Sequence, residues 1–416
     1  MPSRVAAPYN ISVLLVTAAL LLQNAAALAQ SAPPSELREG LLALRDGQLV
    51  VACERLESAA RLAPSNAVVW ASLAQAYRQS QRHADAVKAA REAERLAPGD
   101  PAIQHALAMF YAAEGEPVKA AKFEQKYAAS AKADEDAMAR AANLYLQGGD
   151  AEHAVEAAHA AQARGDRPAL HNLLGAAYEA GGHRQQAIFE LREAVRLDPG
   201  TEEFAFDLAQ ELLRAEDFAG AAASLEAASK RFPASPQISL ALGVAYYGLR
   251  RFPEATQAFV KTIDRAPEVE QPYVFLGKML DQAGSELPRI QAKFEAFHQR
   301  DPSNYLGSFL LAKALLLTGG APERVQALLR ESIARKADFW ETHAELGDLL
   351  ARRKDYAAGA DELRQAAALN PGEASIHFRL ARLYDRLNQP GKAQAERALH
   401  QKLTAASKPG MDTRTP

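Results

Sequence analysis

The sequence predicts an all-α protein built as an array of similar helical hairpins, and three observations lead to this fold class. Alanine is abundant, aromatic residues make up only 7% of the 416 residues, and no long stretch alternates apolar with polar residues as a half-buried strand would. Apolar residues instead recur at spacings of three and four, the period of an amphipathic helix. These helical patterns also repeat along the chain at a nearly constant interval, which predicts a solenoid of stacked units.

The stretch 169–200 shows the repeating unit most clearly. Apolar residues over 170–178 occupy one face of a first predicted helix, which the glycine pair at 181–182 ends. A second apolar face covers 187–195 and stops at the Asp-Pro-Gly sequence of 198–200. The unit is therefore predicted to be a helix, a tight turn and an antiparallel helix.

Eleven such units follow one another between Glu36 and Leu403. Each has a glycine or alanine at the same place in its first helix, where a small side chain lets a neighbouring helix approach closely. An isolated unit buries too little apolar surface to offset the entropy of ordering it, so neighbouring units must stack. The small residues recur every 33 to 35 residues, at Gly40, Ala74, Ala108, Ala142, Gly175, Ala209, Gly243, Gly277, Ala312, Gly347 and Ala381.

Residues 1–29 have the pattern of a secretory signal peptide. Arg4 supplies a positive start, an apolar run of twelve residues follows over 11–22, and Ala-Leu-Ala ends the segment at 27–29. The run is shorter than the roughly 20 residues of a membrane-spanning helix. We expect cleavage after Ala29, export to the periplasm of a bacterium or secretion, and no stable membrane insertion afterwards; an uncleaved anchor is the alternative.

The remaining segments outside the array are short. Residues 30–35 are rich in proline and serine and are predicted to be a linker, whereas 404–416 show no apolar periodicity and are predicted to be a disordered tail. Cys53 is the only cysteine, so no internal disulfide can form, and we interpret it as a small buried side chain.

Composition and motifs exclude several classes of function. The net charge is -3 with both signs interspersed, so no basic face indicates a nucleic-acid partner. The sequence has no metalloprotease, hydrolase or phosphate-loop motif and no cysteine pair, so we expect neither catalytic residues nor a metal or cofactor. Three of the ten histidines, His171, His343 and His377, occupy the place of Trp70 in its unit, where we expect packing groups rather than ligands.

The repeat resembles the tetratricopeptide repeat family, whose 34-residue unit carries a recurring set of Trp, Leu-Gly, Tyr, Ala, Phe, Ala and Pro. The stretch 67–98 matches this set through Trp70, Leu73, Ala74, Tyr77, Ala86, Ala93 and Pro98. The resemblance covers roughly residues 36–403 and implies a right-handed superhelical solenoid of about eleven helix-turn-helix repeats. The units at 287–301 and 319–337 each carry one extra residue, so the register is expected to be least regular there.

The resemblance also implies a non-enzymatic protein that binds protein or peptide segments in a concave groove lined by the first helices. Placing the groove-facing positions of the family on this sequence gives short or polar residues in the second to fifth units and an apolar stripe in the sixth to ninth. The alternative interpretation is that several stripe residues pack between helices. The candidate groove residues are Phe206, Leu240, Val244, Tyr247, Val274, Lys278, Leu306, Phe309 and Lys313.

The sequence thus favours an exported scaffold in the envelope of a Gram-negative-type bacterium, an assignment motivated by the Ala- and Arg-rich composition and the signal pattern. A more specific version is an adaptor or assembly subunit of an export machine for polysaccharide, pili or outer-membrane proteins. An enzyme-linked regulator is the rival from another class, but residues 36–403 leave no span long enough for a catalytic domain. Homo-oligomerisation through the terminal units is a third interpretation.

Overall fold

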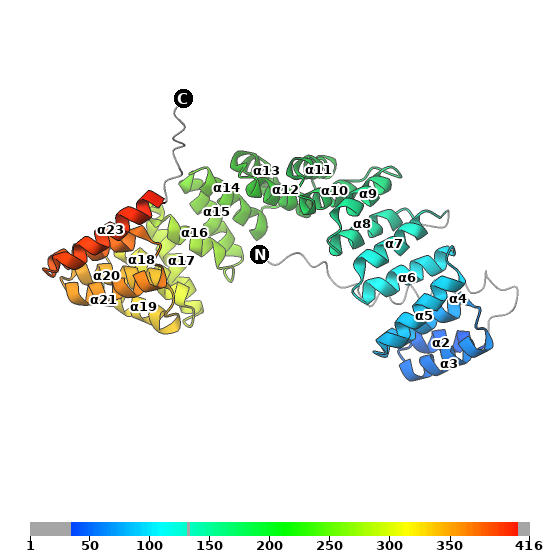
Figure 1. Ribbon diagram of the computed structural model, residues 1–416. Coiled ribbons are helices and arrows are strands. Elements are labelled where there is room, and N and C mark those ends of the chain that lie inside the picture. Colours follow the sequence, from blue (N-terminus) through cyan, green and yellow to red (C-terminus); the bar gives the residue numbers. More distant parts are fainter. Residues whose placement is uncertain (1–34, 131–133, 407–416) are drawn as a thin grey trace, which may run out of the picture. The chain divides into compact units, whose positions relative to one another are not determined.

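The computed structural model describes residues 35–130 and 134–406, and every regular element within these ranges is helical (Figure 1). The predicted all-α repeat fold is confirmed. The predicted signal peptide, the linker up to residue 34 and most of the predicted tail lie outside the described residues. The chain divides into two compact units between Ala215 and Glu216, and each unit is described by itself.

The first unit contains eleven helices that alternate between the first and second helices of successive hairpins, the even-numbered ones being first helices. They are α2 (Ser35–Arg45), α3 (Leu49–Leu62), α4 (Ala67–Gln79), α5 (His83–Leu96), α6 (Pro101–Ala113), α7 (Pro117–Ala128), α8 (Ala137–Gln147), α9 (Ala151–Gln162), α10 (Pro168–Ala180), α11 (Arg184–Leu197) and α12 (Glu202–Arg214).

The second unit continues the same alternation and contains two short 3-10 helices between α16 and α17. Its elements are α13 (Phe218–Arg231), α14 (Pro236–Gly248), α15 (Phe252–Arg265), α16 (Gln271–Lys278), η1 (Leu280–Gln282), η2 (Gly284–Glu286), α17 (Leu287–Arg300), α18 (Tyr305–Thr318), α19 (Pro322–Arg335), α20 (Trp340–Arg352), α21 (Tyr356–Leu369), α22 (Ala374–Arg386) and α23 (Pro390–Ala406).

Side chains at the N-caps start several of the first helices. The Asn66 side chain accepts a hydrogen bond from the amide of Val68 at 3.0 Å, and Asn304 does the same for Leu306. Asp100 accepts from two amides at the start of α6. The first amides of a helix have no partner within it, so these caps satisfy donors that would otherwise be left unpaired.

Closing prolines end the second helices. Ala63, at the end of α3, has φ -133° and ψ 67°, and Ala266, at the end of α15, has φ -137° and ψ 69°. Each precedes a proline, whose ring disfavours the helical conformation in the residue before it. The recurring prolines of the sequence therefore set the length of the second helices.

The turn inside each hairpin places one residue in the left-handed region of the backbone. In the turn after α10 this residue is Gly182 (φ 77°), and the amide of His183 donates to the Tyr178 carbonyl at 2.8 Å, a common way to end a helix. The predicted turn at the glycine pair 181–182 is thus confirmed. The left-handed residues recur with the period of the repeat: Gly47, Gln81, Gly115, Gly149, Gly182, Glu216, Arg250, Gly284, Gly319, Lys354 and Asn388.

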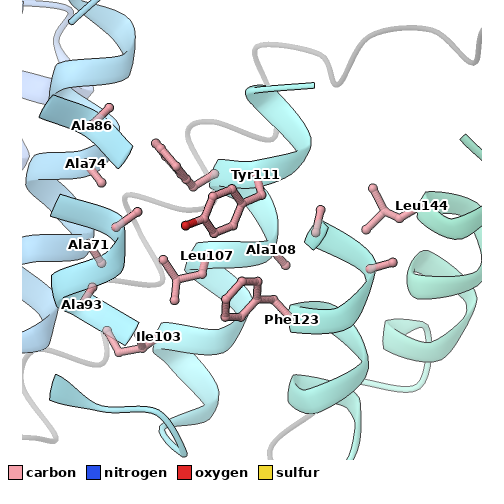
Figure 2. Packing of buried hydrophobic residues seen from close by; sticks show 14 of the residues in the cluster. Ala71, Ala74, Ala86, Ala93, Ile103, Leu107, Ala108, Tyr111, Phe123 and Leu144 are labelled. Atoms are coloured by element: carbon pink, nitrogen blue, oxygen red, sulfur yellow. The ribbon is translucent and has the colours of Figure 1, made fainter. Parts of the chain in front are cut away.

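The small residue of the first helix lies directly against the second helix of its own hairpin. A Cβ atom added to Gly175 would lie 2.6 Å from Leu191, and one added to Gly243 would lie 2.6 Å from the Phe259 ring. Alanine, leucine and a few rings fill the core within and between hairpins, and Figure 2 shows Tyr111 and Phe123 among them. The centroids of these two rings are 5.4 Å apart. Close helix contact therefore depends on the absence of a side chain at these positions.

The hairpin around Gly277 departs from this pattern. Helix α16 has only eight residues, and the two 3-10 turns replace the rest of the expected first helix. A Cβ atom at Gly277 would lie 2.3 Å from Leu310 of α18 rather than against α17, so α16 packs on the next first helix. The irregular register lies next to the unit at 287–301, where the sequence carries an extra residue.

The C-terminal helix is longer than the sequence predicted. Helix α23 continues to Ala406, three residues beyond the array boundary predicted at Leu403. Ala393 is the only residue that α23 buries completely, as suits an end cap. No helix among the described residues is both long and apolar enough to cross a bilayer.

Candidate peptide-binding groove

The structure places the candidate groove residues on first helices of both units. Phe206 lies on α12 in the first unit and is half-buried. The other eight residues lie on α14, α16 and α18 of the second unit. These eight residues belong to one compact unit and are described together below.

Helix α14 presents an apolar row. Leu240, Val244 and Tyr247 are spaced by four and three residues, which places them on one face of the helix, and all three are half-buried. Helix α14 has no charged side chain along its whole length. The Tyr247 ring packs edge-to-face on Phe275 of α16, with centroids 5.2 Å apart. This contact joins the apolar row of α14 to α16.

Helix α16 contributes Val274 and Lys278 at its last turns. Val274 is half-buried and Lys278 is exposed. Since the helix ends at Lys278, the Gly277 carbonyl has no helical amide to accept from, and the Lys313 ammonium of α18 donates to it at 3.0 Å. Lys313 therefore closes the end of α16, at the carbonyl of the residue that precedes Lys278.

Leu306 and Phe309 on α18 are not free surface. Each retains only 6% of its accessible area. The Phe309 ring packs edge-to-face on Phe339, with centroids 5.0 Å apart. For these two residues the structure agrees with the alternative interpretation, in which stripe residues pack between helices, because α18 is buried along most of its length. Their side chains are therefore part of the packing around α18.

Aromatic and charged residues that sequence reasoning missed lie next to α18. Lys336, which follows α19, has its ammonium 4.5 Å from the centroid of the Tyr305 ring and 5.9 Å from that of Phe339. The rings of Tyr305 and Phe339 are 5.0 Å apart. Lys336 and Phe339 lie in the connection between two helices, outside the groove-facing positions of the repeat, so periodicity gave no signal for them.

Glu341 of α20 is the acidic counterpart of these lysines. Burial raises the pKa of the Glu341 carboxyl, and the positive charges of Lys278, Lys313 and Lys336 act in the opposite direction. Its Oε2 atom is buried and has no hydrogen-bond partner among the described residues. Burial also raises the pKa of Glu345, one helical turn further along α20. The α16–α20 region therefore combines lysines with carboxyl groups that are partly desolvated.

The predicted packing histidines are buried and hydrogen-bonded. Their Nδ1 atoms lie 2.6 to 2.7 Å from glutamate carboxylates 19 residues later, in the pairs His171–Glu190, His343–Glu362 and His377–Glu396. Such pairs join the first helix to the second helix of one hairpin. The described residues contain no cluster of three or more His, Cys, Asp or Glu side chains that could hold a metal ion.

The residue at the position of Trp70 in each repeat can also form a hydrogen bond to the turn that precedes its hairpin. Trp70 Nε1 donates to the Pro64 carbonyl at 2.8 Å, and Nε2 of His343 lies 3.1 Å from the Ala337 carbonyl. Both acceptors are six residues upstream. Tryptophan and histidine can both serve here because each provides a flat aromatic ring with a nitrogen that can donate a hydrogen bond.

Comparison with known proteins agrees with the repeat geometry. Models of the tetratricopeptide repeat match residues 206–269, 67–110 and 168–201. No curated protein matches the sequence.

Several solved structures are similar to this chain, at low identity. The Cut9–Hcn1 hetero-tetramer of APC/C is 12% identical over 94% of this chain and 96% of that one, with a TM-score of 0.42. PilW, a type IV pilus biogenesis factor, is 18% identical over 50% and 95%, with a TM-score of 0.43. YrrB, whose structure has an unusual peptide-binding site, is 20% identical over 44% and 95%, with a TM-score of 0.36.

Proposed function

Because the chain carries tetratricopeptide repeats, we propose that it is a non-enzymatic scaffold that binds protein or peptide segments along its first helices. Repeat arrays of this kind present an extended surface to a partner, and their units stack on neighbours without enclosing a catalytic pocket. The apolar row of α14 is the observation that carries the proposal. An uncharged helix with half-buried Leu240, Val244 and Tyr247 offers apolar contact, and Lys278 nearby offers a polar edge.

We further propose that the scaffold works outside the cytoplasm, within the envelope of a Gram-negative-type bacterium. The signal-peptide pattern of residues 1–29 supports export. On this proposal the chain serves as an adaptor or as an assembly subunit for the export of polysaccharide, pili or outer-membrane proteins. An enzyme-linked regulator is the less favoured rival, and association through the terminal repeats is compatible with either role.

Photo-crosslinking in living cells tests the binding surface. A photoreactive phenylalanine analogue at Tyr247 is expected to capture a partner, whereas the same analogue at Phe189 is not. Phe189 lies on the second helix α11 and is 61% exposed, so it controls for mere accessibility. Tyr247→Glu is expected to lower recovery of the partner at least about tenfold, since buried tyrosines are frequent binding hot spots. Equal capture at both positions would contradict the proposal.

Cell fractionation tests the site of action. The chain expressed in a Gram-negative host is expected in the periplasmic fraction with Gln30 as its first residue. Val13→Asp, which breaks the apolar run, is expected to leave the chain in the cytoplasm. A chain that keeps residues 1–29 and stays cytoplasmic without that change would refute export but leave the binding proposal standing.

A further inference from the structure

We propose that the groove of the second unit binds an acidic peptide, whose carboxylates contact a lysine trio formed by Lys278, Lys313 and Lys336. The inference rests on the proposed binding function and names the chemistry of the partner. The positive charges of these three lysines, which come from different elements, all act on the carboxyl of Glu341. They come from the end of α16, from α18 and from the residue after α19.

The lysine trio has no ion pair among the described residues. Other basic side chains of the same unit do have one: Arg324 lies 2.6 Å from Glu295, and Arg335 lies 2.5 Å from Glu331. Those pairs are on second helices, whereas Lys278 and Lys313 are on first helices. Unlike these two arginines, none of the three lysines has a carboxylate of the described residues within ion-pair distance.

Neighbouring groups hold two of the three ammonium groups in place. Lys313 donates to the Gly277 carbonyl at 3.0 Å, and its ammonium is 6.0 Å from the centroid of Phe309. The Lys336 ammonium is 3.4 Å from the Tyr305 hydroxyl and 4.5 Å from the centre of the Tyr305 ring. An ammonium group has three donors, so each lysine keeps donors for a ligand. Because these side chains are already ordered, binding loses less conformational entropy.

Glu341 leaves the positive charge of the lysine trio incompletely balanced. It lies near all three lysines, yet no ammonium of the trio forms an ion pair with it in the described part of the chain, and its Oε2 atom has no hydrogen-bond partner. One carboxyl group stands against three ammonium groups, so Glu341 alone leaves a net positive charge. A carboxylate from a partner would supply the acceptors that the three ammonium groups lack.

The apolar surroundings favour a peptide among the anionic partners. The Lys278 ammonium is 6.0 Å from the centroid of Phe275, whose ring packs on Tyr247 of the apolar row. Half-buried Val274 lies on the same helix. A carbohydrate polyanion would present carboxylates but few apolar groups. A peptide that alternates acidic and apolar residues presents both, because successive side chains of an extended chain point to opposite faces.

Fluorescence anisotropy with the full chain tests this assignment. The probe is a labelled eight-residue peptide that alternates aspartate with leucine, and the matched probe has asparagine in place of aspartate. The site variant is Lys278→Gln with Lys336→Gln, which leaves Lys313 in place to close α16. The control variant is Lys230→Gln with Lys261→Gln, which removes the same charge from second helices α13 and α15. Thermal unfolding of both variants checks that the fold is intact.

The unmodified chain is expected to bind the aspartate probe at least roughly fivefold more tightly than the asparagine probe, from two to three charge contacts. The site variant loses this preference and the control variant keeps it. Equal binding of the two probes, binding of neither, or equal loss in both variants would overturn the inference. Polygalacturonate that competes as well as unlabelled aspartate peptide would overturn it too. If crosslinking at Tyr247 still captures a partner in those cases, the binding proposal survives and only the acidic partner is refuted.

Discussion

At the scale of single residues, the hairpin turns show how one backbone conformation recurs with different side chains. The left-handed position is glycine in some turns, such as Gly182, and an L-residue in others, such as Gln81, Arg250 and Lys354. An L-residue there brings its Cβ atom close to the following carbonyl oxygen, which costs roughly 1 to 2 kcal/mol. The turns that lack glycine are therefore the places where the array stores backbone strain.

Substitutions at two turns test this difference. Gly182→Ala is expected to lower the free energy of unfolding by about 1 kcal/mol, because alanine is strained where φ is positive. Lys354→Gly is expected to raise it by up to about 1 kcal/mol, and Lys354→Ala serves as the control that keeps a Cβ atom. Urea unfolding measures all three. If Lys354→Gly and Lys354→Ala had the same stability, backbone strain would not be the cause.

The His343–Glu362 pair makes a pH-dependent contribution to stability. The hydrogen bond to Glu362 raises the pKa of His343 above its ordinary value of 6.5, against the effect of burial, and the Ala337 carbonyl adds to the increase. A raised pKa in the folded state means that folding favours the protonated ring. The contribution is therefore complete below about pH 6.5 and is lost as the pH rises through the higher value of the folded state.

Glu362→Gln should reveal this dependence. The variant is expected to lose about 1 kcal/mol of stability at pH 5.5, where the charged hydrogen bond is complete, and less at pH 8.5. The difference in free energy of unfolding between the two chains, measured in urea at both pH values, is the readout. Glu323→Gln is a control because the Glu323 side chain is 75% exposed. A loss that is the same at both pH values would contradict the assigned pKa direction.

At the scale of the helix, the small residues of the first helices decide how closely a hairpin can pack. Gly40, Gly175, Gly243 and Gly347 each face a large side chain 16 residues later in the second helix. Gly277 instead faces Leu310 of α18. In full-length first helices the glycine therefore faces the second helix of its own hairpin. In the shortened helix α16 it faces the next first helix instead.

Gly243→Leu is expected to disrupt one hairpin. Its new side chain would overlap the Phe259 ring, which is completely buried, so stability should fall by about 1 to 3 kcal/mol with a lower thermal midpoint. Gly99→Leu is the matched control, since a Cβ atom at Gly99 would meet nothing within 4 Å. Phe259→Leu added to Gly243→Leu should recover part of the loss, because it removes the ring that the new side chain overlaps. An unchanged midpoint for Gly243→Leu would refute the assigned register.

At the scale of the molecule, each repeat depends on its neighbours in sequence. The helices of a hairpin bury their apolar faces against each other and against the adjacent hairpin, so stability is close to a sum of local terms. The C-terminal cluster of Ile376, Leu380 and Tyr384 on α22 is covered by α23, which contributes buried Ala393. Loss of the last helix should therefore affect the nearby repeats and leave distant ones unchanged.

Deletion of α23 tests this locality. A chain that stops at Gln389 exposes the α22 cluster, and hydrogen exchange in α20–α22 is expected to accelerate at least about tenfold. Exchange in α2–α5 should remain as it was, because those helices belong to the other compact unit and are many repeats away along the chain. Removal of only the residues beyond Ala406 is the control. Equal acceleration at both ends would indicate one cooperative unit in place of nearest-neighbour coupling.

The sequence alone determined the features that depend on residues close together in the chain. The spacing of apolar residues predicted the helices, and the small residues predicted the period of the repeat. Prolines such as Pro64 and Pro267 marked the ends of second helices. The period was also sufficient to identify the turns and to place His171, His343 and His377 as buried packing groups. These features follow from local backbone sterics and from amphipathic periodicity, which each repeat carries in full.

Only the tertiary structure decided what happens between repeats. Leu306 and Phe309 occupy groove-facing positions in the pattern but are buried, because α18 is enclosed by its neighbours. Helix α16 stops at Lys278, and Lys313 closes its end from the next first helix. Lys336 lies in the connection between α19 and α20, outside the groove-facing positions of the repeat, and its ammonium contacts the Tyr305 ring of α18. Which side chains are buried and which lysines come close together depend on contacts between neighbouring repeats. The periodicity of the sequence contains no information about those contacts.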